Sequence, residues 1–190
     1  MRITKTYFTN DVLVIAPDLL GKKLVRVFPD GSRKEYLIAE TEAYRGEEDL
    51  ACHACKGKTS RTKILYHEGG VVYVYLIYGI YWLLNIVTGQ NDQPQAVLIR
   101  GLKEIKGPGR VGRELQLDKS FYGEDLTQSD RLWIEDGPAV CNYTADIRVG
   151  IDYAGELWRN KLWRFRLAEQ TEIGLNKKTG QPFFCQPQKK

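Results

Sequence analysis

The sequence contains only two histidines and four cysteines in 190 residues, which limits the metal and disulfide chemistry open to it. Cys52 and Cys55 lie close together, whereas Cys141 and Cys185 are isolated. This spacing is unlike the dense framework of a small secreted domain, so we expect reduced thiols. A closed zinc site needs four well-spaced ligands, and His53 is too close to Cys52 and Cys55 for one ion to bind all three. The sequence therefore favours a protein without bound metal.

Export signals, internal repeats and low-complexity blocks are also missing. The N-terminal segment 1–13 has no apolar stretch of signal-peptide length, because polar residues interrupt it early, so we expect a cytoplasmic protein. A chain of this length with 43% hydrophobic residues fits one domain over residues 1–190, with a polar, loosely held segment from Asn176. The net charge of +4 and the pI ≈ 8.8 suit a polyanionic partner without requiring one.

The longest uncharged run, residues 69–91, approaches the length of a membrane helix. However, residues 71–77 are rich in β-branched and aromatic side chains, and a Tyr78-Gly79 dipeptide interrupts the run where a hairpin would turn. Two strands joined at Tyr78-Gly79 are therefore favoured over a membrane helix or a buried helix. We expect no membrane association.

The hairpin interpretation gives four of its side chains a direction. Tyr73 and Tyr75 share one face, because side chains alternate along a strand. Tyr78 lies at the tip, where it either contacts something external or folds back on the domain. Asn85 falls among apolar residues of the return strand and needs hydrogen-bond partners there, so it is either a structural amide or a reader of a ligand edge.

The remaining segments indicate a strand-rich α+β fold without regular βαβ alternation. We expect a short helix over residues 11–20 and another after the Gly-Pro-Gly at 107–109. The second helix start could present backbone N–H groups to a phosphate, although an ordinary turn explains the same residues. Further strands are expected at 22–28, 35–44, 96–104, 131–135, 147–151 and 162–166.

Reactive groups are concentrated in the strand that ends in "ETEAY". Glu40, Glu42 and Tyr44 alternate with small residues and therefore share one face, with the carboxylates about 7 Å apart along the chain. Such a pair suits a metal, acid–base work on a glycosidic bond, or simply a solvated surface. Arg100 ends the apolar stretch "AVLIR" and either reaches solvent or pairs with one of these carboxylates. His53 is either a ligand-facing imidazole or a hydrogen-bonded core residue.

The segments "ETEAY", "YVYLIYG", "AVLIR" and "GPG", in this order, resemble the alkyladenine (3-methyladenine) DNA glycosylase family, also called methylpurine-DNA glycosylases. The resemblance covers about residues 11–166. It implies a compact α+β domain with a curved, mostly antiparallel sheet, surrounding helices and a protruding β-hairpin. It also implies a nucleoid-associated monomer that binds the minor groove of double-stranded DNA and uses no cofactor.

The resemblance also assigns roles around a flipped nucleotide. Tyr78 matches the side chain that fills the space left in the base stack. The residues that match the pocket sandwiching the extruded base are Tyr44, His53 and Tyr75. Asn85 matches an asparagine whose side chain disfavours the exocyclic amino group of normal guanine.

The implied reaction uses one carboxylate. Glu42 matches the residue that activates water, Arg100 matches the arginine near that water, and Glu40 is left as a supporting or surface residue. Alkylation makes a purine cationic and a better leaving group, so hydrolysis would need little acid catalysis and would leave an abasic site. A non-catalytic nucleic-acid binding module and a metal hydrolase using Glu40, Glu42 and His53 are the alternatives.

Overall fold

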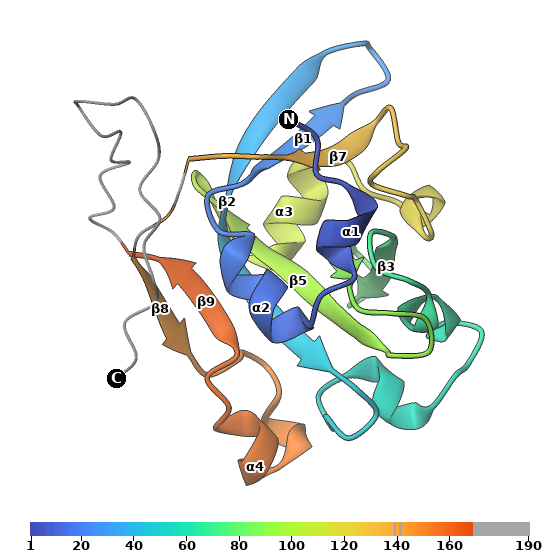
Figure 1. Cartoon of the computed structure of the whole chain (residues 1–190), viewed down its shortest axis with the longest axis vertical. Coiled ribbons are helices and arrows are strands. Elements are labelled where there is room, and N and C mark those ends of the chain that lie inside the picture. The colour runs from blue at the N-terminus through green and yellow to red at the C-terminus, as the bar shows by residue number, and fades with distance from the viewer. Residues whose placement is uncertain (139, 141, 169–190) are drawn as a thin grey trace.

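One antiparallel sheet of nine strands organises the residues that the computed structural model describes, which are 1–138, 140 and 142–168 (Figure 1). Its main path has the order β3-β4-β5-β2-β1-β7, while β6 pairs with β5, and β9 pairs with β2 and β8. The predicted α+β fold with a mostly antiparallel sheet is confirmed. The strands are β1 (Lys23–Val27), β2 (Arg33–Arg45), β3 (Val72–Ile77), β4 (Tyr81–Val87), β5 (Gln95–Leu102), β6 (Ile105–Lys106), β7 (Leu132–Glu135), β8 (Tyr143–Asp146) and β9 (Arg164–Leu167).

Short helices connect these strands. The helix expected over 11–20 is α2, which begins after Asp11, whose side chain accepts a hydrogen bond from the backbone N–H of Leu13 at 2.8 Å. The helix expected after Gly-Pro-Gly begins inside that motif, at Pro108. The described α-helices are α1 (Lys5–Phe8), α2 (Val12–Asp18), α3 (Pro108–Glu114) and α4 (Glu156–Arg159), and the 3₁₀ turns are η1 (His53–Lys56), η2 (Lys63–Tyr66), η3 (Lys119–Phe121) and η4 (Asp152–Ala154).

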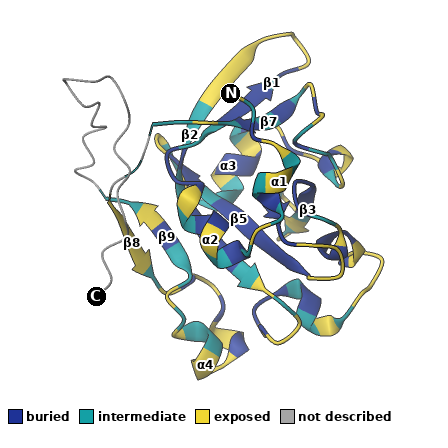
Figure 2. Ribbon diagram, viewed as in Figure 1, coloured by how far each residue is buried: buried dark blue, intermediate teal, exposed yellow. Residues whose placement is uncertain are grey.

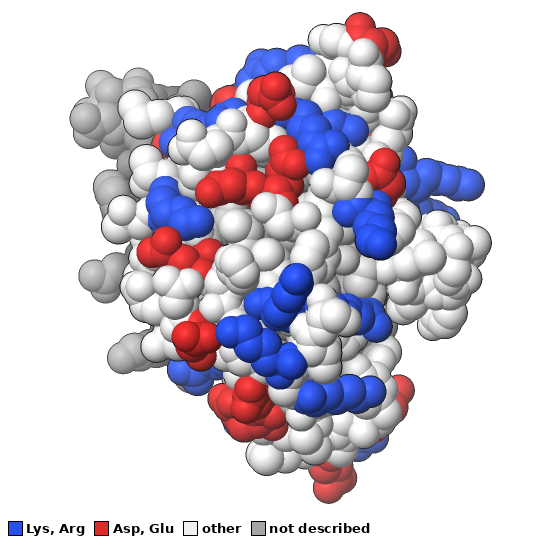
Figure 3. All heavy atoms as spheres, turned by 90° about the vertical axis from the view of Figure 1, so that its right-hand side faces the viewer, with Lys and Arg blue, Asp and Glu red and all other residues white. Residues whose placement is uncertain are grey.

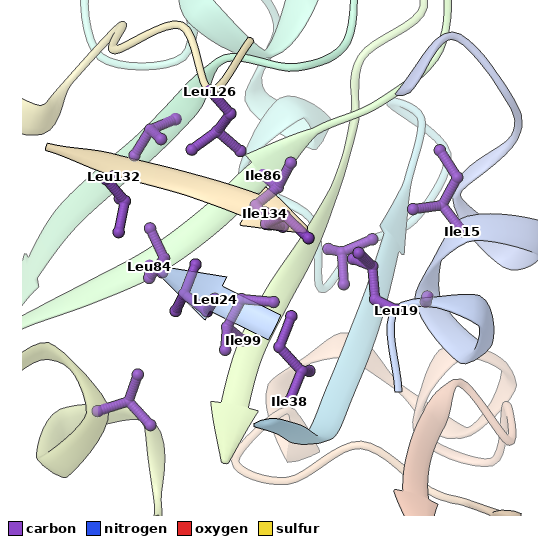
Figure 4. Close-up of a cluster of buried hydrophobic side chains, with 14 of the residues drawn as sticks. Ile15, Leu19, Leu24, Ile38, Leu84, Ile86, Ile99, Leu126, Leu132 and Ile134 are labelled. Carbon is purple, nitrogen blue, oxygen red and sulfur yellow. The ribbon is translucent and has the colours of Figure 1, made fainter. Parts of the chain in front are cut away.

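The main apolar core lies against one face of the sheet, and alternate side chains of β5 point to the two faces. Val97 and Ile99 point into the core together with side chains of α2 and α3, whereas Ala96, Leu98 and Arg100 belong to the opposite face. Figure 2 shows β5 buried along most of its length, and Figure 4 shows the isoleucine and leucine side chains that pack around it. Each fully buried side chain of this size contributes about 1.5–3 kcal/mol. Arg100 therefore lies on a strand that the core anchors firmly.

The predicted hairpin is confirmed as β3 and β4. Tyr78 and Gly79 both have positive φ, 53° and 71°, and the N–H of Ile80 donates to the carbonyl of Ile77 at 3.2 Å, which is a primed hairpin turn. The Tyr78 side chain does not fold back, because the residue is 84% exposed. Among the described residues, no helix is long and apolar enough to span a membrane.

One predicted strand is wrong. Residues 147–151 form a loop, and the strand that pairs with β9 lies earlier, at Tyr143–Asp146. The alternation of Ile147, Arg148 and Val149 looks like a strand, but Ile147 and Val149 are 44% and 46% exposed while Arg148 is buried. The loop backbone is held by side chains instead of a ladder, as described below. The segment from Asn176, expected to be loosely held, lies outside the described residues.

Candidate active site

Glu42 is the central group of the site, and its side chain is fully buried in β2. One carboxylate oxygen accepts hydrogen bonds from the backbone N–H of Val149 at 3.0 Å, and the other accepts from the Tyr44 hydroxyl at 2.8 Å. Burial raises the pKa of Glu42, and the positive charge of Arg100 with these two donors opposes that rise. The site therefore holds a desolvated carboxylate that has charged and polar partners.

Arg100 joins the two carboxylates of the "ETEAY" strand. Its Nε lies 3.2 Å from Glu40 and its Nη1 lies 3.5 Å from Glu42. Glu40 has a second partner in Arg164, at 3.1 Å. The side chains of Glu40 and Arg100 are only 16% and 17% exposed, so both the solvated-surface interpretation of the carboxylates and the solvent-reaching interpretation of Arg100 are wrong.

A small cavity of about 30 Å³ opens beside Glu42's strand. This space holds about one or two water molecules. Four residues singled out from the sequence, Tyr44, His53, Tyr75 and Asn85, line it together. The cavity is completed by Ala51, Cys52, Leu65, Tyr73 and Ala96.

The aromatic side chains of the cavity contact each other directly. The ring centroids of His53 and Tyr75 are 4.7 Å apart at an interplanar angle of 70°, which is an edge-to-face contact. His53 Nδ1 lies 2.8 Å from the Tyr73 hydroxyl, which is also 3.2 Å from the Nε of Arg61. Burial, with the nearby charges of Arg61 and Lys56, lowers the pKa of His53 to about 4. The imidazole is therefore neutral at physiological pH.

Asn85 serves the backbone of its own hairpin. Its amide nitrogen donates to the carbonyl of Tyr73 at 3.1 Å and to that of Leu83 at 3.4 Å, and the residue is 4% exposed. Both partners are carbonyl oxygens, so the atom that faces them must be the amide nitrogen, and the side-chain oxygen takes part in neither hydrogen bond. Asn85 thus has the hydrogen-bond partners that a buried amide needs, and the same residue also lines the cavity.

A buried ion pair beneath the site could not be found from the sequence. Asp49 and Arg148 have fully buried side chains that meet at 2.5 and 2.9 Å. The guanidinium carbon of Arg148 lies 4.8 Å from the Tyr44 ring centroid and 5.0 Å from that of Trp163. Because Arg148 precedes Val149, this pair anchors the loop whose N–H group binds Glu42.

Metal ligands are not gathered anywhere in residues 1–138, 140 and 142–168, where no three His, Cys, Asp or Glu side chains could hold one ion. Cys52 and Cys55 are free thiols, as expected, while Cys141 and Cys185 lie outside the described residues. On the face shown in Figure 3, Lys and Arg side chains are interspersed with Asp and Glu side chains. This face therefore has no continuous patch of positive or negative charge.

The fold brings a buried glutamate, an arginine and a cluster of aromatic rings together in one site of an α+β domain. A family model described as methylpurine-DNA glycosylase matches residues 6–106 and 103–171. The chain therefore belongs to the methylpurine-DNA glycosylase family.

Relatives from three organisms are similar over nearly their whole length, and each carries the name "Putative 3-methyladenine DNA glycosylase". The relative from Psychrobacter cryohalolentis is 37% identical, and the alignment covers 93% of this chain and 95% of the relative. One from Methanocella arvoryzae is 40% identical and covers 86% and 90%. One from Anaeromyxobacter sp. is 41% identical and covers 88% and 89%.

Proposed function

We propose that this chain, a 3-methyladenine DNA glycosylase of DNA repair by its family, flips alkylated or deaminated purines out of duplex DNA and hydrolyses their N-glycosidic bond. It does so as a monofunctional, cofactor-free monomer in the cytoplasm, at the nucleoid, and leaves an abasic site. The observation that carries the proposal is the buried carboxylate of Glu42, held by Arg100, Tyr44 and Val149 beside an aromatic cavity.

Glu42 is the proposed activator of water. As the bond between C1′ and the base nitrogen breaks, positive charge develops on the sugar, and an ionised carboxylate stabilises that charge. The same carboxylate takes a proton from the attacking water as oxygen bonds to C1′, and the base leaves with the bond electrons. Arg100 favours the ionised form of Glu42, because its charge opposes the rise in the pKa of Glu42 that burial causes. Since water attacks, no Schiff base forms and the strand is not cut.

The aromatic residues around the cavity are the proposed binding pocket for the extruded base. Electron-rich rings attract a cationic base by about 0.5–2 kcal/mol, which favours alkylated purines over neutral ones. A neutral His53 adds no repelling charge. A purine is larger than the cavity, so its entry requires Tyr44, His53 and Tyr75 to move apart. We assign Asn85, which stands at the wall, to the exclusion of the amino group of guanine.

Tyr78 is the proposed wedge that replaces the flipped nucleotide in the minor groove. Its ring is 84% exposed at the hairpin tip, where Leu76 and Ile80 are also exposed, at 42% and 67%. Exposed apolar side chains at a tip gain nothing from the protein core, but they do gain from contact with unstacked bases.

The experiment is to incubate the protein with a duplex containing one hypoxanthine, and separately with methylated DNA, and then to treat with hot alkali. Strand breaks at the lesion indicate base release. Glu42→Gln should bind the lesion duplex but release base about 10²–10⁴-fold more slowly. The matched control is Glu104→Gln, because Glu104 is an exposed carboxylate outside the site. No breaks with the native protein, or native rates from Glu42→Gln, would contradict the proposal, and lesion binding without base release would favour a non-catalytic module.

A further inference from the structure

The Tyr73 hydroxyl lies between Arg61 and His53. Tyr73 is 2% exposed, and its oxygen is 3.2 Å from Arg61 Nε and 2.8 Å from His53 Nδ1. No other hydrogen-bond partner of this hydroxyl occurs among the described residues. Its ring packs against those of Tyr75 and Tyr122. The group is thus a hydroxyl with two nitrogen neighbours in a buried place.

The chemistry of the three groups decides which atom donates. A guanidinium can only donate, so Arg61 Nε–H donates to the oxygen of Tyr73. The single proton of Tyr73 then has one acceptor within reach, which is His53 Nδ1. In the opposite arrangement His53 Nδ1–H would donate to Tyr73, and the buried O–H would lack an acceptor, which is costly. Burial raises the pKa of Tyr73, so the hydroxyl keeps its proton.

The arrangement has a consequence for the other nitrogen of the imidazole. If Nδ1 accepts and the ring is neutral, the ring proton must be on Nε2. Nε2 has no partner among the described residues, and His53 lines the cavity. The imidazole that lines the cavity therefore carries an Nε2–H donor with no protein partner among the described residues, and the contacts of Nδ1 decide which nitrogen holds the proton.

We propose that Arg61 and Tyr73 form a hydrogen-bond relay that fixes His53 as the Nε2–H tautomer, so that the pocket selects nucleotides presenting a lone pair to that donor. Arg61 and Tyr73 are positioning residues, because they act through His53. The specificity rests on the proposed function, whereas the tautomer does not. The acceptor is a ring nitrogen or carbonyl oxygen of the base, or an oxygen of its sugar-phosphate.

The tautomer is measured by two-dimensional ¹⁵N–¹H correlation of the histidine side chains at pH 7.5. The chain has only two histidines, so His67→Gln assigns the signals of His53. We expect His53 to show protonated Nε2 and unprotonated Nδ1. Tyr73→Phe, which keeps the ring, should give a mixture of tautomers, and the distant Tyr36→Phe should not. A protonated Nδ1 in the native protein, or a pattern unchanged by Tyr73→Phe, would overturn the relay.

If Tyr73→Phe does not fold, Arg61→Met tests the relay from its exposed end, since Arg61 is an exposed residue. It leaves Tyr73 without its donor and opens this position to water, which can accept from the Tyr73 O–H in place of His53, so we expect the His53 signals to shift toward the mixture. Unchanged signals in a folded Arg61→Met would count against the role of Arg61. These measurements need no glycosylase activity, so they stand even if the protein releases no base.

Single-turnover rates then test the specificity, with Tyr36→Phe as the matched loss of a distant hydroxyl. Tyr73→Phe should slow excision of hypoxanthine about 3- to 10-fold, the effect of one hydrogen bond. Loss that differs between hypoxanthine and 3-methyladenine indicates a base acceptor. Equal loss, with weaker binding to abasic-site DNA, indicates a sugar-phosphate acceptor. Unchanged rates on both lesions, with an altered tautomer, would overturn the selection.

Discussion

Replacing Asp49 by asparagine should destabilise the protein more than any single surface substitution. Arg148 would keep its charge in a fully buried place without a counter-charge. Breaking a buried pair by removing one partner costs about 3–5 kcal/mol. The two carboxylate oxygens of Asp49 also accept hydrogen bonds from the backbone N–H groups of Arg45 and Ala51. The NH₂ group of asparagine cannot accept, so one of these N–H groups would lose its partner. At about 2–4 °C per kcal/mol for a domain of this size, the Tm should fall by about 6–20 °C.

The assay is thermal unfolding followed by circular dichroism at pH 7.5. Asp92→Asn is the matched control, because Asp92 pairs with Lys58 at the surface with a 77% exposed side chain, and its Tm should change little. The double variant Asp49→Asn with Arg148→Met removes both charges and should recover part of the loss. A Tm for Asp49→Asn equal to that of the control would refute the reasoning, because it would mean that the buried charge costs nothing.

Three further predictions concern the site and the hairpin. Arg100→Gln should move the acidic limb of the pH–rate profile to higher pH, because Arg100 lowers the pKa of Glu42 against the effect of burial; an unmoved limb would remove Arg100 from this role. Tyr78→Asn should raise the free energy of unfolding by about 1 kcal/mol, since asparagine tolerates the positive φ of the turn better, while weakening lesion binding in fluorescence titration. Lower stability with unchanged binding would contradict this. Between pH 6.5 and 4 the unfolded chain takes up a proton on His53 that the folded chain does not, so native stability to urea falls as the pH falls, and His53→Gln should lose less over the same range.

The features that could be predicted from the sequence are those encoded by neighbours in the chain. The Tyr78-Gly79 turn and the strands on either side follow from turn chemistry and alternation, and both were found as expected. Alternation also places Glu40 and Glu42 on one face, where Arg100 meets them. The roles of these residues in catalysis remain predictions from the family resemblance.

The features that could not be predicted depend on contacts between distant segments. Asp49 and Arg148 are separated by 99 positions, and nothing in either neighbourhood indicates the partner. The same contact explains why the strand predicted at 147–151 is wrong. Exposed and buried side chains alternate along this segment as they do in a strand, but its backbone is held by side chains and not by a neighbouring strand. The relay through Tyr73 was missed for a related reason, since a tyrosine in a strand indicates packing and gives no sign of where its hydroxyl points.

The position of β3 at the end of the sheet has a consequence for the protein in solution. Its first residues are covered, because Val72 exchanges backbone hydrogen bonds with Gly123 and Glu124 at 2.8–2.9 Å. Beyond Tyr73, no described strand pairs with its outer side, and the segment up to Ile80 has no charged residue to discourage a neighbour. Open, apolar strand edges are templates for strand addition by a second chain. We therefore expect concentrated, DNA-free protein to self-associate through this hairpin, and the Leu76→Lys variant to stay dispersed.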